Sequence, residues 1–366
     1  MISVIFQRFI AALKRFGVSQ FANKNKILSV VPIPVTGAFI TGLCLSVLFA
    51  ACTANNASNT TAVSTDNPTQ TKASVVRFGY QKAAIIIKAK GVLEKRLQPE
   101  GKSVQWIEFP AGPQLLEAMN VGSIDFGHTG ETPPIFAQAA GASIAYIAGI
   151  AANPPGQAIL VPQNSQIKTI ADLKGKKIAV QKASSAHYLL VQILEKAGLQ
   201  YTDIEPVFLP PADARAAFVK GSIDGWAIWD PFYAAAEQSI NARVLITGEG
   251  ISKQGGYYLA SRKFATENSE TIKAILEEIK NLEDWSDKHR DEVAATLSPV
   301  LGIDLETMKK ATKRKNFGVV PIDENLINLQ QQVADKFYDL KLLPKQVNVK
   351  QAMLSPEQYA AFSPKR

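Results

Sequence analysis

Short apolar runs alternate with amphipathic segments from residue 75 onward, and their order predicts the fold. The apolar runs predict strands at 75–80, 104–109, 124–127 and 144–150. The segments between them predict helices at 84–97, 114–121 and 133–140. Strands that alternate with helices at this pace are typical of a parallel α/β sheet with crossover connections.

The same order starts again in the second half of the chain. Apolar runs predict strands at 158–161, 176–180, 207–209, 225–229 and 243–247, with helices at 184–197, 213–220 and 231–238. After a strand at 256–260, amphipathic patterns predict helices at 269–288, 290–297 and 325–340. We expect two α/β lobes, residues 74–162 with 256–366 and residues 163–255, joined by a two-stranded hinge beside a ligand cleft.

The N-terminal residues have the pattern of an export signal. Residues 1–26 are basic, and an uninterrupted apolar run at 35–51 ends in small residues before Cys52. The ending Ala-Ala-Cys resembles a bacterial lipoprotein box, so we expect residues 1–52 to be a leader and Cys52 to carry a lipid. Simple cleavage just before Cys52 is the alternative, and the run is short for a permanent spanning helix.

Residues 53–73 are rich in Thr, Asn, Ser and Ala, a composition that cannot bury a core. We interpret them as a flexible linker between a membrane anchor and the folded body. Together the leader and the linker predict an exported, periplasmic protein that is held at the membrane if Cys52 is lipidated.

Charge and cysteine content exclude several classes of function for the body. The formal charge of +8 falls to 35 basic against 32 acidic residues once the five basic residues of 1–51 are set aside, so nucleic-acid binding is disfavoured. The two cysteines, Cys44 and Cys52, precede the body, which therefore lacks thiols for disulfides, zinc or catalysis. The three histidines are scattered without paired spacing, so we expect no metal site; they are His128, His187 and His289.

Small and polar residues fill three strand-to-helix turns, at 109–114, 127–133 and 181–187. Ligands of parallel sheets bind beyond the carboxyl ends of the strands, where such turns gather. Helix N-termini favour anions, and hydroxyl groups add donors without adding charge, so the turns predict a site for a tetrahedral or trigonal oxyanion. The alternative is that Ser184 and Thr132 only cap their helices.

The segment WAIWDP at 226–231 is the most unusual stretch of the chain. Trp226 and Trp229 are three residues apart on a predicted strand, so they point in different directions and one of them can line a cleft. An indole suits an aliphatic tail or a cationic group. Asp230 can cap the following helix or bind a ligand amine. The alternative is that both tryptophans belong to the core.

Motifs of common enzyme classes are absent. The sequence contains no GxGxxG, P-loop or GxSxG pattern, and Asp125 and Glu131 form a carboxylate pair with no obvious partner base. We therefore expect a protein that binds its ligand without catalysis and without a cofactor.

Six segments, taken together and in order, resemble the aliphatic sulfonate-binding proteins of sulfonate ABC importers. They are FGYQK at 78–82, FPAGPQ at 109–114, NVGSIDFG at 120–127, PPIFAQAAG at 133–141, PADARAAF at 211–218 and WAIWDP at 226–231. The resemblance covers residues 75–349, which is nearly all of the body. The GSID and WDP pieces also occur in related nitrate, taurine and pyrimidine-precursor binders.

The resemblance implies a type II periplasmic-binding-protein fold whose two lobes close on a sulfonate for sulfur acquisition. It implies docking of the loaded protein on a membrane permease that an ATPase drives. The residues it implies for the ligand site are Gln81, Gly112, Pro113, Thr129, Gly130, Ser184, Ser185, Trp226, Trp229 and Asp230. The alternatives are a binder of nitrate, taurine or a pyrimidine precursor, with Asp230 or Glu131 as the acid that taurine requires, and an enzyme of the same fold.

Overall fold

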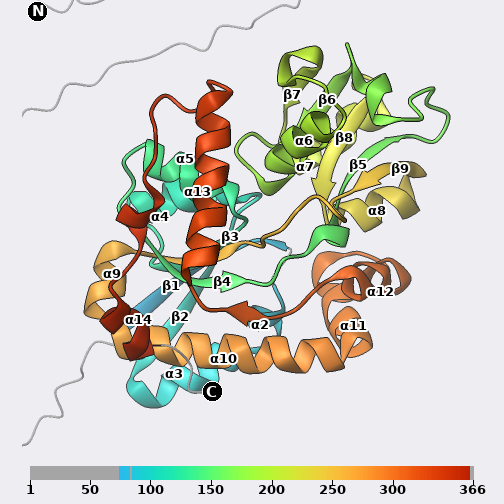
Figure 1. The fold of residues 1–366 in the computed structure, drawn as a ribbon. Helices are drawn as coiled ribbons and strands as arrows, with labels where there is room; N and C mark the ends of the chain where they lie inside the picture. The colour runs from blue at the N-terminus through green and yellow to red at the C-terminus, as the bar shows by residue number, and fades with distance from the viewer. Residues whose placement is uncertain (1–73, 83–84, 363–366) are drawn as a thin grey trace, which may run out of the picture. The chain divides into compact units, whose positions relative to one another are not determined.

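Two β-sheets organise the part of the chain that the computed structural model describes, residues 74–82 and 85–362 (Figure 1). The predicted leader, the predicted linker and Cys52 lie outside the described residues. All described residues belong to one compact unit, Pro68–Arg366. Within the described ranges, we find no helix that combines the length and the hydropathy needed to cross a bilayer.

The first sheet has six strands in the order β11-β4-β10-β3-β1-β2. Its strands are β1 (Ser74–Tyr80), β2 (Lys102–Glu108), β3 (Phe126–Thr129), β4 (Ile144–Ile150), β10 (Tyr257–Ser261) and β11 (Val319–Val320). Strand β1 pairs in parallel with β2 and β3, and β10 runs antiparallel between β3 and β4. β10 is the strand predicted at 256–260, and it returns the chain to the first sheet.

The second sheet has five strands in the order β7-β6-β8-β5-β9. They are β5 (Gln157–Pro162), β6 (Lys177–Val180), β7 (Glu205–Phe208), β8 (Gly225–Trp229) and β9 (Ala242–Thr247). The predicted lobe boundary at residue 162 placed β5 in the first lobe. In the structure β5 pairs with β8 and β9, so it belongs to the second sheet. An apolar run specifies a buried strand but not which sheet it joins, so the pattern alone could not place β5.

Helices cover both faces of each sheet. Those of the first lobe and the C-terminal segment are α2 (Ile86–Lys90), α3 (Val92–Leu97), α4 (Gly112–Asn120), α5 (Thr132–Ala139), α9 (Arg262–Glu267), α10 (Ser269–Lys288), α11 (Arg290–Leu301), α12 (Leu305–Arg314), α13 (Glu324–Asp339) and α14 (Pro356–Phe362). Those of the second lobe are α6 (Ser185–Lys196), α7 (Pro211–Val219) and α8 (Phe232–Ser239).

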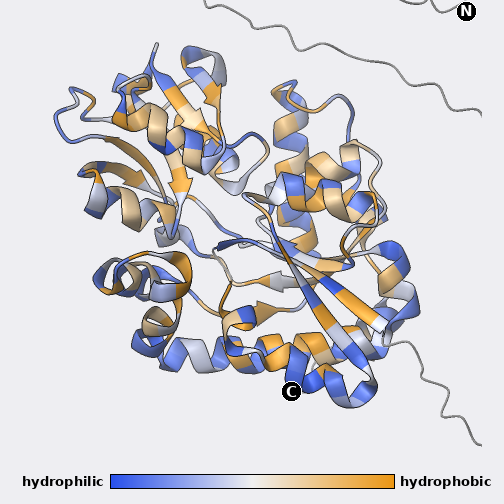
Figure 2. Cartoon of the chain, turned by 180° about the vertical axis from the view of Figure 1, so that it is seen from behind, coloured by the Kyte–Doolittle hydropathy of each residue, from blue (hydrophilic) through white to orange (hydrophobic). Residues whose placement is uncertain are grey.

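Alternation along the strands sends neighbouring side chains into different cores. On β10, Tyr257 belongs to the core shared with α4 and α13, whereas Tyr258 belongs to the core shared with α3 and α10. On β5, Ile159 faces α6 and Leu160 faces α7 and α8. Figure 2 shows the same concentration of hydrophobic residues along the strands of both sheets.

Two connections join the lobes, one from β4 to β5 and one from β9 to β10 (Figure 1). They are hydrogen-bonded to each other: Ile150 N donates to Gly256 O at 2.9 Å, and Gly248 N donates to Pro154 O at 3.1 Å. A Cβ atom at Gly255 would lie 2.2 Å from Ile150 O, so the close approach of the two connections requires glycine there. This is the arrangement that a two-stranded hinge needs.

One helix prediction is wrong, and helix α12 was missed. The helix predicted at 84–97 is interrupted at Gly91, whose φ of 62° is left-handed and separates α2 from α3. Helix α12 was not predicted, because most of its residues are charged or polar. The signal that marks its start is Asp304, whose Oδ1 accepts a hydrogen bond from Thr307 N at 2.9 Å.

Candidate functional site

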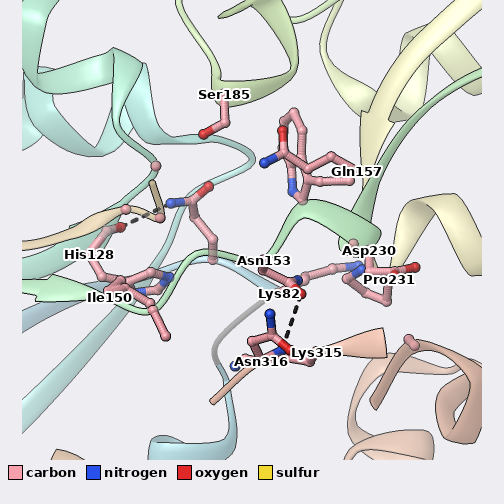
Figure 3. Close-up of a pocket in the computed structure, with 18 of the residues that line it drawn as sticks. Lys82, His128, Ile150, Asn153, Gln157, Ser185, Asp230, Pro231, Lys315 and Asn316 are labelled. Atoms are coloured by element: carbon pink, nitrogen blue, oxygen red, sulfur yellow. Dashed lines mark hydrogen bonds between the residues drawn. The ribbon is translucent and has the colours of Figure 1, made fainter. Parts of the chain in front are cut away.

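A pocket lies between the two lobes, at the carboxyl ends of β1 and β3 in the first sheet and of β8 in the second. Ser185 reaches toward it from α6, and Lys315 and Asn316 reach it from the opposite side, after α12 (Figure 3). This is the position at which open α/β sheets bind their ligands.

The first turns of four helices line this pocket. Gly112 and Ser185 are the first residues of α4 and α6. Glu131 and Pro231 directly precede α5 and α8. Each helix N-terminus carries about half a positive charge and amides without helical acceptors. Their convergence favours an anionic group in this part of the pocket.

The two serines at the start of α6 have different partners. Ser184 Oγ accepts from His187 N at 3.3 Å and donates to Gln181 O at 2.7 Å, so its hydroxyl proton is already used and Ser184 caps the helix. Ser185 Oγ lies against the first lobe, 1.6 Å from where a Cβ of residue 130 would stand. Ser185 is therefore the hydroxyl that crosses from one lobe to the other, and Gly130 leaves room for it.

The part of the pocket near the helix N-termini is here called the anion-binding end. Polar groups of the first lobe line it on the side opposite α6. Gln81 is buried and its Nε2 donates to His128 O at 3.0 Å, which ties the end of β1 to β3. Thr129 is buried, and its Oγ1 donates to Gly130 O at 2.9 Å. A Cβ at Gly112 would lie 2.6 Å from Pro133 Cγ, so glycine lets the start of α4 pack against the start of α5.

Eight of the ten predicted ligand residues line the pocket: Gln81, Gly112, Thr129, Gly130, Ser184, Ser185, Trp229 and Asp230. Pro113 and Trp226 do not line it. Trp226 is a correction, since it is 1% exposed and its ring packs 6.1 Å from that of Phe218. The odd spacing along β8 places Trp226 in the core and leaves Trp229, paired with Gln157 of β5, at the pocket. Pro113 is the second residue of α4, and the pocket is lined by its neighbour Gly112.

Asp230 is paired within the protein. Its Oδ1 accepts from Ala234 N at 3.0 Å, and its Oδ2 lies 3.2 Å from Arg314 Nε. Arg314 and Lys310 also pair with Glu237 at 2.7 and 2.8 Å, which links α12 to α8. Burial raises the pKa of Asp230 to about 7, and the charge of Arg314 opposes this rise. Oδ1 thus has a hydrogen bond and Oδ2 has an ion-pair contact without a hydrogen bond, so the charge of Asp230 is balanced within the protein by Arg314.

The C-terminal segment supplies pocket residues that the sequence did not indicate. Lys315 Nζ lies 3.9 Å from Oε1 of the buried Glu283, whose Oε2 accepts from Gly318 N at 3.0 Å. Asn316 N donates to Asn153 Oδ1 at 3.1 Å, next to the hinge (Figure 3).

Lys82 also lines the pocket, and none of the described acidic residues forms an ion pair with it.

The opposite end of the pocket is mainly apolar, although Lys315 and Asn316 lie on that side as well. Its lining comes mainly from the helices α11 and α12, together with one side chain of α2 and one that follows α12; these are Val293, Leu297, Leu301, Met308, Ala311, Ile86 and Phe317. One continuous pocket therefore offers amides and hydroxyls at one end and hydrocarbon at the other.

Two buried titratable groups also line the pocket. Burial and the nearby charge of Lys315 lower the pKa of His128 to about 4, so His128 is neutral at physiological pH. Burial raises the pKa of Glu131 to about 7. Within the described ranges, no three His, Asp or Glu side chains come together as a metal site.

Comparison with known proteins places the chain in a family. The model of the family described as NMT1/THI5 like matches residues 98–292. A protein of Escherichia coli (strain K12), named as an aliphatic sulfonates-binding protein, is 45% identical over 287 residues, which cover 77% of this chain and 89% of that protein. This chain belongs to the NMT1/THI5-like family.

Solved structures of similar proteins agree with the fold. The alkanesulfonate-binding protein of Xanthomonas axonopodis pv. citri, bound to MOPS, matches with a TM-score of 0.74 and 43% identity over 77% of this chain and 98% of that one. The periplasmic aliphatic sulphonate binding protein of Escherichia coli matches with a TM-score of 0.70 and 43% identity over 77% and 92%. The resemblance and the type II periplasmic-binding-protein fold class predicted from the sequence are confirmed.

Proposed function

We propose that this protein is the substrate-binding component of an ABC importer and that it captures aliphatic sulfonates. The observation that carries the proposal is one pocket with an anion-binding end, built by four helix N-termini, and an apolar end, built by α11 and α12. A sulfonate is a tetrahedral anion on a hydrocarbon tail, so it matches both ends at once. The sulfonate-binding relatives support the same ligand class.

Binding proceeds by closure of the two lobes without covalent chemistry. The head group contacts Gln81, Gly112, Thr129 and Gly130 from the first lobe and the start of α6 from the second, while Trp229 borders the tail. A ligand that touches both lobes favours the closed arrangement, because only that arrangement makes both sets of contacts. The hydrogen-bonded connections at Ile150 and Gly256 are the proposed hinge.

The partners and the location follow from this role. The loaded protein docks on a membrane permease that an ATPase drives. The leader exports the chain to the periplasm, where lipidated Cys52 holds it at the membrane through the linker. The periplasmic relative of Escherichia coli supports this location.

A thermal-shift panel on the full-length protein tests the ligand class. The ligands are a short and a longer alkanesulfonate, taurine, sulfate, nitrate and a pyrimidine precursor. Alkanesulfonates are expected to raise the melting temperature, because a ligand at 100 times its Kd adds about 2.7 kcal/mol to the stability of the folded state. The longer alkanesulfonate is expected to raise it more, because its tail fills more of the apolar end of the pocket. A shift with nitrate or the pyrimidine precursor alone contradicts the proposed ligand, and a shift with taurine alone points to an amine-binding site.

A further inference from the structure

Glu131 is a buried carboxyl group at the anion-binding end of the pocket. It is 4% exposed, lines the pocket beside Gly130, and directly precedes α5. Thr132 Oγ1 donates to Glu131 Oε1 at 3.3 Å, and the Ser185 hydroxyl of the other lobe lies close enough to the same carboxyl group to lower its pKa. The carboxyl thus stands where the two lobes meet, at the place that the proposed function gives to the head group.

This carboxyl group has no cationic partner in the part of the chain that the structure describes. Among the described residues, none of the lysines, arginines or histidines forms an ion pair with Glu131. The lysines that line the same pocket are Lys82 and Lys315, and neither contributes to the shift of its pKa. A buried carboxylate without a positive partner is costly, so burial favours the protonated form.

The groups that face Glu131 from the neighbouring elements are neutral. Tyr188 of α6 and Tyr257 of β10 lie within its electrostatic reach, and burial raises both of their pKa values. His128 of β3 is neutral because its pKa is lowered to about 4. Gln330 of α13 donates to the main-chain oxygen of Glu131 at 2.6 Å and not to its carboxyl group.

We propose that Glu131 binds the ligand as a neutral carboxyl group, donating a hydrogen bond to an oxygen of the anionic head group, so that each ligand enters together with one proton above neutral pH. This inference rests on the proposed function. An ionised Glu131 beside a bound anion would place two negative charges in one buried site, where each charge lowers the stability of the other. The proton removes that repulsion and turns an acceptor into a donor.

The sign of the pH dependence follows from linkage. Burial raises the pKa of Glu131 to about 7 in the free protein, and a neighbouring anion raises it further in the complex. Above about pH 7 the complex therefore holds more protons than the free protein, and affinity falls as the pH rises. A sulfonate stays ionised throughout this range, so the ligand contributes no titration of its own.

Calorimetric titration of the full-length protein with an alkanesulfonate, from about pH 6 to about pH 9, tests the inference. The wild type is expected to lose about 100-fold in affinity over this range, because each pH unit above the pKa costs about tenfold. Titrations in two buffers of different ionisation enthalpy are expected to show uptake of about one proton per ligand near pH 8. The Glu131→Gln variant, which keeps a neutral donor, is expected to bind with an affinity that hardly changes with pH.

The control is Glu117→Gln, which removes the same charge from an exposed position on α4 and is expected to behave like the wild type. Wild-type binding that does not change with pH, and that takes up no proton, overturns the role of Glu131 while leaving sulfonate binding intact. Equal pH dependence in the wild type and in Glu131→Gln also overturns it and points to Asp230. Absence of binding at every pH contradicts the proposed function itself, and the inference falls with it.

Discussion

Replacement of Trp226 by alanine is expected to destabilise the protein by about 3–5 kcal/mol, the usual cost of truncating a buried large aromatic side chain. Trp226 is 1% exposed on β8, the central strand of the second sheet. Its neighbours Ala179 and Ala214 are fully buried and small, so the fold leaves an indole-sized space that no adjacent side chain can fill after truncation. Urea denaturation followed by circular dichroism measures the loss.

Trp229→Ala is the matched control, because the same residue type on the same strand lines the pocket. It is expected to lose less stability than Trp226→Ala and more affinity for an alkanesulfonate. The reverse order of the two stability losses would contradict the placement of Trp226 in the core and of Trp229 at the ligand.

Replacement of Gly130 by alanine is expected to weaken ligand binding by about 5- to 150-fold. An ideal Cβ at residue 130 would lie 1.6 Å from Ser185 Oγ and 3.0 Å from Ser185 Cβ, across the contact between the lobes. The hydroxyl can rotate away but the Ser185 Cβ cannot, so the lobes must separate slightly or accept strain. Such overpacking costs about 1–3 kcal/mol, which sets the expected range of affinity.

Isothermal calorimetry of Gly130→Ala, Ser185→Gly and the double variant measures this effect. Ser185→Gly removes both of the atoms that the new methyl group meets. The Gly130→Ala substitution is therefore expected to reduce the affinity for the ligand much less in the Ser185→Gly background than in the wild type. A double-mutant cycle measures this coupling directly. Equal costs in the two backgrounds would show that the lobes do not meet at these residues when ligand is bound.

The sequence predicts the strands, the turns and the place of the site because these depend on local pattern. Apolar runs specify β1, β6 and β8, and small polar residues after β3 and β6 mark the turns that face the pocket. Local contacts also decide between the two roles considered for Ser184, ligand binding and helix capping. Its hydroxyl caps α6 and donates its proton to Gln181 O. Glycine at 130 and serine at 185 could be named in advance, but not their contact, which depends on how the lobes meet.

Other parts of the site depend on tertiary packing that no local pattern contains. Trp226 and Trp229 are equivalent in the sequence, and what separates them is which face of β8 meets the small side chains of the neighbouring elements. Lys315 and Asn316 come to the pocket from more than 50 residues beyond β10, after α12, whose polar sequence gave no helix prediction. That none of the described cations forms an ion pair with Glu131 is likewise a property of the assembled lobes, since it depends on every element that packs around this residue.

A crystal structure of the protein with a medium-length alkanesulfonate would show directly whether the pocket between the lobes holds the head group at one end and the tail at the other. We expect the sulfonate oxygens within hydrogen-bonding distance of the Thr129–Gly130 turn, the start of α6 and the Glu131 carboxyl, with the tail directed toward Leu297 and Met308. A head group held instead by Lys315 and Asn316, with the tail toward the helix N-termini, or a ligand bound outside the pocket between the lobes, would contradict it.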